Sequence, residues 1–401
     1  MTTQTEGGSV KVAPRTNRYR RTRRSELVIW WREIDRVLLS LVLALVAVGV
    51  VAVAASSPAS AHRLSTPGKT LGDLYFFWLH LRWLTVGLFA MFVASLLPKE
   101  TTRRLAILLA GAMLVALVLV PILGSEVKGA RRWLFIGFSL QPSEFLKPGF
   151  AIAVAWILSW RVRDPNIPVI GITIGLMGLV GALLMAQPDF GSTVLFCGVW
   201  FVLVLLSGLS LARIGWSVGG LIVIFVLAYL FYPNATHRID AFLTGGSEFD
   251  QVDLAMRTMV NGGWSGSGLW LGSRKMALPE AHTDYIFSVI GEEFGLIACA
   301  VIVVLYCAIV VRVMLRLADE EDLFTILAAA GLTAQLAGQA FINILVNLQL
   351  FPSKGMTLPL ISYGGSSTIA LLLGVGFLLA ITRRNPYLSR ETPDFREFAR
   401  A

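Results

Sequence analysis

Three carboxylates at the start of a long apolar segment are the residues best placed for acid–base chemistry. Asp284 stands at the edge of this segment, whereas Glu292 and Glu293 lie inside it. Helical spacing puts Asp284 and Glu292 on one face, with Glu292 about 12 Å deeper. An ionised side chain inside a span needs a partner or a water-filled cavity. The pattern therefore predicts a polar groove, although Asp284 could instead complement a helix dipole.

Basic residues accompany these carboxylates in segments between the apolar ones. They occur in the loop after the third apolar segment, in the longest loop and before the last apolar segment, namely Lys128, Arg132, Arg238 and Lys354. Cations bind phosphate or pyrophosphate groups, and a neighbouring carboxylate can abstract a proton. The combination suits an anionic, lipid-linked substrate.

Other polar residues near the same segments complete the candidate site. Glu144 and Lys147 are three residues apart and could support the groove by pairing, a spacing that equally serves a purely structural ion pair. His282 is either a substrate ligand or a structural hydrogen-bonding residue. The remaining candidates are Gln187 and Asp189, which could line the groove, and Ser362 and Ser366, whose alternative role is close helix packing.

The elements that position these residues are predicted to be membrane-spanning helices. Apolar residues make up 56% of the 401 residues and charged residues 15%, which leaves too little polar surface for a soluble protein. Lipid-exposed backbone must satisfy its own hydrogen bonds, so we expect an all-α polytopic protein with about ten transmembrane helices. The predicted spans are residues 38–55, 75–97, 105–123, 143–160, 169–185, 192–206, 214–232, 285–311, 323–346 and 362–381.

Basic residues predict the orientation of these spans. By the positive-inside rule, the arginine-rich residues 1–36 form a cytoplasmic tail, and an even number of spans returns the tail 383–401 to the same side. Residues 37–382 form the membrane domain, with its longest extracytoplasmic loop at 232–284. The net charge of +9 is then a matter of topology and anionic lipid, with no reason to invoke nucleic acid.

Two further features carry little chemistry. The three cysteines lie within apolar spans without a pairing or metal-binding spacing, so we expect neither a disulfide framework nor a thiolate metal site. The Gly-rich stretch 261–268 allows a close backbone approach, but it lacks the strand and the Gly-Lys-Ser/Thr of nucleotide-binding loops.

Several motifs together resemble the SEDS family (shape, elongation, division and sporulation proteins). The matching segments are 130–133, 141–144 with Lys147, 187–191, 261–264, 278–293 and 352–367, in the family's order. Residues 352–355 resemble the division branch more than the elongation branch, where the lysine is usually replaced. The sequence departs from the family at Tyr285, where Phe is commoner, and at Ser353, where Thr is commoner.

The resemblance implies a peptidoglycan glycosyltransferase that polymerises lipid II during septal cell-wall synthesis. Asp284 matches the family's catalytic aspartate, and the four cations would neutralise the departing pyrophosphate. A divalent cation, Mg or Mn, could take part, with Asp284 or Glu292 helping to hold it. The implied partners are a class B penicillin-binding transpeptidase of the FtsI type and other division membrane proteins. The implied location is the bacterial inner (cytoplasmic) membrane at the division septum.

Two other functions are compatible with such a chain. A flippase for lipid II would also need a polar groove and intramembrane carboxylates, but it would need access from both faces, and the motifs here gather on the outward side. We also see no clear inverted repeat or broken-helix pair of the alternating-access kind. A non-catalytic scaffold would not need the carboxylates at all.

Overall fold

The computed structural model describes residues 23–127, 130–135, 137, 139–208, 215, 219–220, 223, 226, 229–244, 247–352 and 355–384. These residues fall into two compact units, divided after Ile34 and after Arg383. The smaller unit contains α1 (Arg23–Glu33), where the backbone N–H of Arg384 donates to the carbonyl of Glu33 at 3.3 Å. The larger unit contains every described candidate for the functional site.

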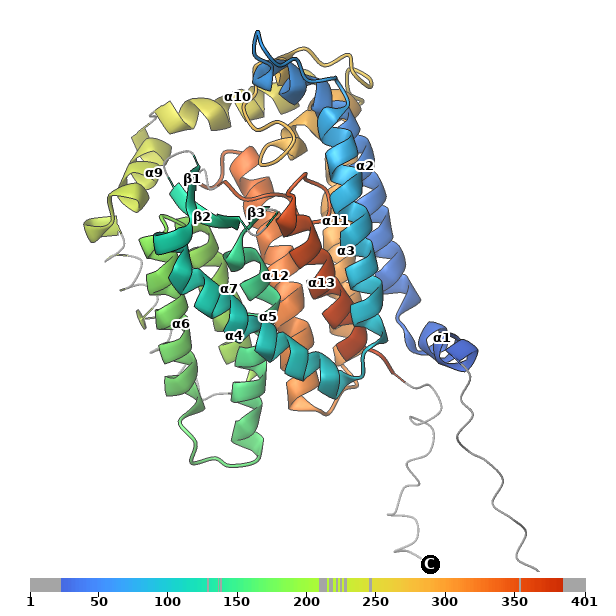
Figure 1. The fold of residues 1–401 in the computed structure, drawn as a ribbon, viewed down its shortest axis with the longest axis vertical. Coiled ribbons are helices and arrows are strands. Elements are labelled where there is room, and N and C mark those ends of the chain that lie inside the picture. Colours follow the sequence, from blue (N-terminus) through green and yellow to red (C-terminus); the bar gives the residue numbers. More distant parts are fainter. Residues whose placement is uncertain are drawn as a thin grey trace, which may run out of the picture. The chain divides into compact units, whose positions relative to one another are not determined.

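The larger unit is built from apolar helices that run side by side (Figure 1). They are α2 (Arg36–Leu64), α3 (Tyr75–Leu96), α4 (Lys99–Leu123), α5 (Pro142–Ser159), α6 (Val169–Ala186), α7 (Phe190–Leu206), α11 (Ile286–Leu317), α12 (Leu323–Asn347) and α13 (Ser366–Ile381). Within the described part of the chain, seven helices are long and apolar enough to cross a membrane, and α7 and α13 are shorter apolar helices. The predicted fold class, an all-α polytopic membrane protein, is confirmed. Most of the predicted span 214–232 lies outside the described residues.

Several helix ends differ from the predicted spans, by up to nine residues: α4 begins at Lys99 rather than at residue 105, and α11 ends at Leu317 rather than at residue 311. Helix α2 continues nine residues past the predicted end at Ala55 and stops at Ser65, whose N–H donates to the carbonyl of Ala61 at 3.0 Å. Helix α13 begins at Ser366 rather than at Ser362, because residues 362–365 form a turn. Hydropathy marks the part of a helix that suits lipid, whereas hydrogen bonds at the caps decide where the helix ends.

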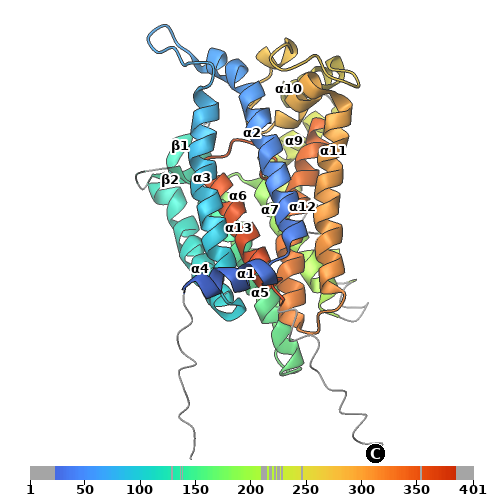
Figure 2. The same cartoon turned by 90° about the vertical axis from the view of Figure 1, so that its right-hand side faces the viewer.

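Helices α12 and α13 occupy the centre of the larger unit. Helix α12 packs against α5, α7, α11 and α13, and α13 packs against α3 and α5. Nearly every side chain of α13 is buried, as expected for a helix that is apolar on all sides after its first turn. The neighbouring helices α2, α3 and α11 lie outside this centre, as Figure 2 shows.

Charged residues join the helix ends at one side of the larger unit. Buried Asp35 caps α2 by accepting from the N–H groups of Val37 and Leu38, both at 3.1 Å. Its carboxylate also binds Arg312 at 2.8 Å. The guanidinium of Arg383 donates to the carbonyl of Leu96 at 3.2 Å. These contacts mark one membrane face of the bundle.

The opposite side carries the longer connections. The loop after α4 forms an antiparallel sheet in the order β1 (Ser125–Val127), β2 (Ala130–Phe135) and β3 (Ser139–Leu140), which the sequence did not predict. The predicted loop 232–284 contains two helices, α9 (Pro233–Thr244) and α10 (Ser247–Asn261), and the short 3-10 helix η2 (Arg274–Met276). The apolar face of α10 packs Val252 and Ala255 against Tyr285 and Val289, and so covers the start of α11.

Candidate functional site

Helix α12 carries four amide side chains at four-residue spacing. This spacing places them on one face of the helix, and all four are buried: Gln335, Gln339, Asn343 and Asn347. Buried amides need hydrogen-bond partners. Three of the four find partners in the segments that carry the candidate site residues.

The first of these segments is the turn that carries Asp284. The carbonyl of Asp284 accepts from the side-chain amide of Asn343 at 2.8 Å and from that of Asn347 at 3.2 Å. The hydroxyl of Ser288, one turn into α11, donates to Asn347 at 2.7 Å. Asp284 is half-buried and lies just before α11 begins at Ile286. Helix α12 therefore fixes the backbone from which the Asp284 carboxylate projects.

The second segment is the chain that follows Lys354. The Asn343 amide that binds Asp284 also donates to the carbonyl of Met356 at 2.6 Å, and Gln339 donates to the carbonyl of Thr357 at 3.1 Å. The Asp284 atom Oδ2 lies 3.6 Å from the place that a Cβ would occupy on Gly355. One face of α12 thus brings the Asp284 carboxylate against the residue next to Lys354.

Two predicted ligands, His282 and Ser362, tie these two segments to each other. The Ser362 hydroxyl donates to the carbonyl of Thr283 at 2.6 Å, and the N–H of Tyr363 donates to the carbonyl of His282 at 3.0 Å. The His282 ring stacks on Tyr363 and lies 2.7 Å from the Ser60 hydroxyl. Both residues hold the Asp284 turn in place in this structure. Ser366, also a predicted ligand, is buried and begins α13.

Glu144 and Lys147 form a buried ion pair at the start of α5. Their charged atoms are 2.6 Å apart, and the Lys147 ammonium also donates to Gln339 at 3.0 Å. The second carboxylate oxygen of Glu144 accepts from the Ser367 hydroxyl at 2.9 Å. The pair links α5 to α12 and α13, so these two residues have a structural role whether or not they also bind substrate.

Arg132, on β2, lies over the junction of α6 and α7. Its guanidinium donates to the carbonyl of Gln187 at 3.2 Å and to that of Pro188, and it lies 3.9 Å from the Asp189 carboxylate. Asp189 caps α7 by accepting from the N–H of Ser192 at 3.2 Å. The Gln187 amide donates to the carbonyl of Leu117 at 2.8 Å. The structure therefore brings Arg132, Gln187 and Asp189 together.

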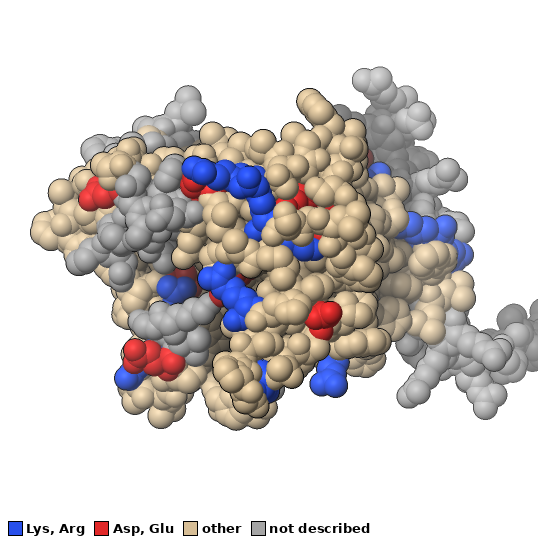
Figure 3. Space-filling view, turned by 90° about the horizontal axis from the view of Figure 1, so that it is seen from above, with Lys and Arg blue, Asp and Glu red and all other residues tan. Residues whose placement is uncertain are grey.

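The other predicted cations lie largely beyond the described coordinates. Lys128 and Lys354 fall outside the described residues, and the structure gives the backbone of Arg238, in α9, but not its side chain. Seen from the side that carries α10, basic and acidic side chains lie near one another on a mostly uncharged surface (Figure 3). Mixed charge on this face is compatible with an anionic substrate held beside a carboxylate.

Glu292 and Glu293 fold the Gly-rich loop against α11. The Glu292 carboxylate is fully buried and accepts from the N–H groups of Arg274 and Lys275, both at 2.8 Å. Glu293 pairs with the buried Lys275 ammonium and accepts from the N–H of Trp270 at 2.6 Å. Both intramembrane carboxylates thus have partners in the protein, and they bind a loop rather than line an open groove.

Helix α11 is broken at Gly295, so the predicted continuous span 285–311 is wrong at this point. Gly295 has φ 83° and ψ 173°, values that favour glycine. The freed carbonyls of Glu292 and Glu293 accept from Ser267 and Gly268 at 2.8 and 3.0 Å. The freed N–H of Leu296 donates to the carbonyl of Gly263 at 3.0 Å. Loop 262–275 therefore supplies the backbone hydrogen bonds that the break removes.

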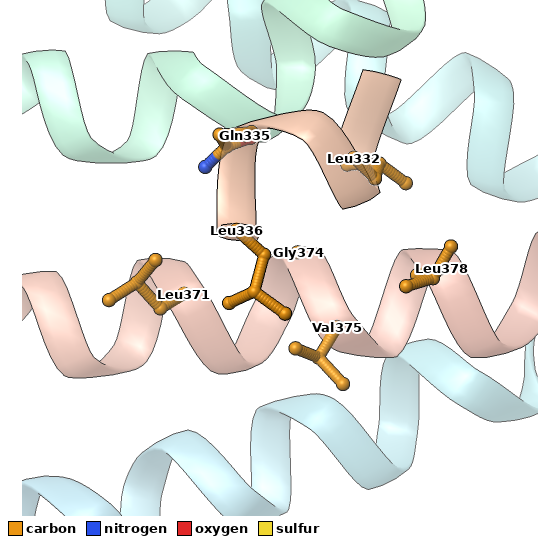
Figure 4. Close-up of a pocket in the computed structure, with 7 residues that line it drawn as sticks. All are labelled: Leu332, Gln335, Leu336, Leu371, Gly374, Val375 and Leu378. Atoms are coloured by element: carbon orange, nitrogen blue, oxygen red, sulfur yellow. The ribbon is translucent and has the colours of Figure 1, made fainter. Parts of the chain in front are cut away.

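A second polar position lies deeper, between α12 and α13. Gln335 lines a small pocket there, and its Oε1 atom has no hydrogen-bond partner in the described part of the chain. The other lining residues are Leu332, Leu336, Leu371, Gly374, Val375 and Leu378 (Figure 4). The lining contains no titratable group, so the pocket offers neither an acid nor a base.

The described residues do not provide a metal cage. Among them, no three His, Cys, Asp or Glu side chains gather closely enough to hold a metal ion. Divalent cations such as Mg²⁺ are nevertheless often held by one or two carboxylates together with substrate phosphates. The described protein groups alone therefore do not form a resident metal site.

The sequence did not lead us to place Asn343 and Asn347 in the site. Sequence reasoning also missed Gln339 and Lys275. The spacing of the α12 amides was a usable signal, since polar residues repeated every four positions share a helix face. Lys275 had no comparable signal, because its partner Glu293 is 18 positions away along the chain.

Comparison with known proteins shows where the chain belongs. Residues 35–387 match the family model of FtsW, RodA and SpoVE, described as cell cycle proteins. A protein of Caulobacter vibrioides, named probable peptidoglycan glycosyltransferase FtsW, is 35% identical over 374 residues, which cover 92% of this chain and 95% of the relative. A protein of the same name from Hahella chejuensis is 36% identical, with 87% and 90% covered.

Two solved structures share the fold. A chain from a study of how a peptidoglycan synthase complex coordinates polymerization and crosslinking matches with a TM-score of 0.71 and 28% identity, covering 90% of this chain and 100% of that one. The rod shape determining protein RodA of Thermus thermophilus matches with a TM-score of 0.64 and 29% identity, covering 88% and 97%. The chain therefore belongs to the SEDS family of FtsW, RodA and SpoVE cell cycle proteins.

Proposed function

We propose that this chain is a peptidoglycan glycosyltransferase that polymerises lipid II during septal cell-wall synthesis, with Asp284 as the general base. The observation that carries the proposal is the convergence at Asn343. A single amide binds the backbone of Asp284 and the segment that follows Lys354. An acid and a cation-bearing segment are thereby held together at the membrane edge, where a lipid-linked substrate would present its sugar and diphosphate.

The reaction needs one proton acceptor and one leaving group. The Asp284 carboxylate takes the proton of the acceptor sugar hydroxyl as that oxygen forms a bond to the anomeric carbon of the donor. The bond between this carbon and the pyrophosphate oxygen breaks, and undecaprenyl pyrophosphate leaves with the electron pair. Attack from the opposite face inverts the anomeric carbon. The hydrogen bonds from Asn343 and Asn347 hold the backbone from which the carboxylate projects before the substrate arrives.

Negative charge develops on the departing pyrophosphate, and basic residues would stabilise it. We assign this role to Lys128, Arg132, Arg238 and Lys354. Arg132 uses two of its donor groups for the Gln187 and Pro188 carbonyls, which leaves other guanidinium donors for a phosphate oxygen. The Glu144 and Lys147 pair, together with His282, Ser362 and Ser366, would shape the walls of the substrate groove. A preorganised cation stabilises developing negative charge more strongly in a site with little water than in solution.

A divalent cation remains a proposal of its own. Mg or Mn could neutralise the pyrophosphate, with Asp284 as a ligand, although the described residues do not form a metal cage. Polymerisation by the purified chain should be measured with and without a chelator. Unchanged activity would remove the metal from the account.

The relatives suggest partners and a location. We propose that the chain works in the cytoplasmic membrane at the division septum with both termini in the cytoplasm, and that it assembles with a class B penicillin-binding transpeptidase and other division proteins. Cross-linking the purified chain to such a transpeptidase in vesicles would test the assembly. A fluorescent fusion of the chain that does not concentrate at the septum would contradict the location.

The direct test of the reaction is the Asp284→Asn variant. The substitution keeps the shape of the side chain and removes its basicity, so we expect glycan polymerisation from purified lipid II to fall at least 100-fold, since general base catalysis typically contributes 10²–10⁴-fold. Asp73→Asn is the matched control. Asp73 lies on the turn between α2 and α3, and its exposed carboxylate faces His62 of α2. Wild-type polymerisation by Asp284→Asn would overturn the role. Lipid II translocation in vesicles without polymerisation would favour a flippase.

A further inference from the structure

The loop that fills the break in α11 carries large, exposed apolar side chains. We refer to residues 264–271 as the tryptophan loop. Trp264 and Leu271 expose 75% and 73% of their surface, and Leu269 and Trp270 are also exposed. The backbone of the loop is fixed by Glu293 and by the hydrogen bonds at Gly295, so these side chains are held outward rather than collapsed onto the bundle. An exposed apolar patch of this kind marks a membrane or partner contact.

The depth of the tryptophan loop can be measured along α2. The Trp270 indole donates to the carbonyl of Ala54 at 3.1 Å, and the nearby Lys275 ammonium donates to that of Ala55 at 3.0 Å. Ala54 lies about 27 Å along the helix from Arg36 at ~1.5 Å per residue. A hydrocarbon core is about 30 Å thick. Because the cluster of Asp35 and Arg312 marks one face of the bundle, Trp270 lies near the opposite boundary between acyl chains and head groups.

The tryptophan loop also continues the lipid-facing surface of α11. Ile297, Val301 and Val304 are exposed and share one side of this helix, which is the surface that a spanning helix presents to acyl chains. The N–H of Ile297 donates to the carbonyl of Trp264 at 3.3 Å. The apolar stripe on α11 therefore runs directly into the exposed side chains of the loop.

We propose that the tryptophan loop binds the head-group boundary of the lipid bilayer, with Trp264, Trp270 and Leu271 inserted. Tryptophan prefers this boundary because its ring is apolar and its N–H is polar. Exposed Arg274 follows three residues after Leu271, a position from which a cation can meet lipid phosphates. The bilayer then holds the loop that completes the broken helix, and so supports the segment that begins beside Asp284.

Depth-dependent quenching in vesicles tests this placement. Cys197, Cys299 and Cys307 would be replaced by alanine in the full-length chain, and single cysteines introduced as Trp264→Cys or Leu271→Cys would be labelled with an environment-sensitive fluorophore. Vesicles of phosphatidylethanolamine and phosphatidylglycerol would carry nitroxides either near the head group or deep in the acyl chain. Two labelled controls bracket the scale: Cys307 retained alone, exposed in the middle of α11, and Lys69→Cys, on the turn beyond α2.

We expect both loop labels to be quenched at least twofold more by the shallow nitroxide than by the deep one. The label on Cys307 should show the reverse order, and the label at position 69 should respond to neither. Loop labels that behave like position 69 would overturn the proposal. Loop labels that resist lipid quenchers and become shielded when a second membrane protein is added would also overturn it, because the surface would then be a protein interface. The two loop positions are independent, so the test survives if one variant fails to fold.

Discussion

The buried pair of Lys275 and Glu293 should be the ion pair on which the fold of loop 262–275 most depends. The side chains of Lys275 and Glu293 are 2% and 0% exposed. Lys275→Met keeps the length of the side chain but leaves the Glu293 carboxylate buried without its cation. Breaking a buried pair in this way typically costs 3–5 kcal/mol. Because Glu293 keeps the N–H of Trp270 at 2.6 Å, we expect a loss near the lower end, about 3 kcal/mol.

The double variant Lys275→Met with Glu293→Gln separates a lost charge pair from general damage. Removing both charges eliminates the unpaired carboxylate, and glutamine can still accept from Trp270, so at least half of the lost stability should return. The assay is unfolding by dodecyl sulfate in mixed micelles, followed by tryptophan fluorescence. Arg274→Met is the matched control: its side chain is exposed, so we expect a change within about 1 kcal/mol. A single variant as stable as wild type, or a double variant no better than the single, would refute the reasoning.

Three further predictions follow from other contacts. Asn343→Leu removes the amide that binds both Asp284 and Met356, so polymerisation of lipid II should fall about 100-fold, the cost of a ~1 Å misplacement. For Gln335→Leu, on the same helix face, the rate of polymerisation should stay within twofold of wild type. Equal rates for the two variants would contradict the role of Asn343. Glu144→Ala leaves the Lys147 ammonium buried without its carboxylate and should cost about 3 kcal/mol in the same unfolding assay; an unchanged midpoint would be incompatible with the ion pair. Gly295→Ala places a Cβ against the Trp264 carbonyl at positive φ, and should cost more than ~1 kcal/mol, whereas Gly175→Ala, with open space in α6, should be neutral or stabilising.

The helical bundle could be predicted from the sequence because one physical variable, hydropathy, decides where its helices lie. Runs of apolar residues long enough to cross a bilayer have no alternative to helices in lipid, so helices such as α3 and α12 lie where hydropathy puts them. The strands β1 and β2 could not be predicted in the same way. Their pairing, for example Glu126 opposite Arg131, lies within a short polar loop, where hydropathy carries no period.

The break at Gly295 shows a different limit. A glycine inside an apolar helix of a membrane protein is common and usually serves close packing, so position 295 alone does not predict a break. Gly262 and Gly266 pack their backbones against residues 291–294. This is a tertiary contact between segments that are distant in the sequence. Glu292 and Glu293 were the one available sign, because buried carboxylates in a span require partners. Sequence reasoning recognised the requirement but expected a groove where the partners proved to be a loop.

The position of Asp284 follows from restraints at both ends of one short helix. Residues 286–294 form a rigid segment about 13 Å long at ~1.5 Å per residue. At its start, Asn343 and Asn347 hold the carbonyl of Asp284, and at its end the N–H groups of Ser267 and Gly268 hold the carbonyls of Glu292 and Glu293. In a rigid segment held at two ends, a displacement at one end is passed on to the contacts at the other. We therefore expect a ligand that moves loop 262–275 to strain the hydrogen bonds to the Asp284 carbonyl as well, so that a partner bound to this loop would alter the rate of polymerisation.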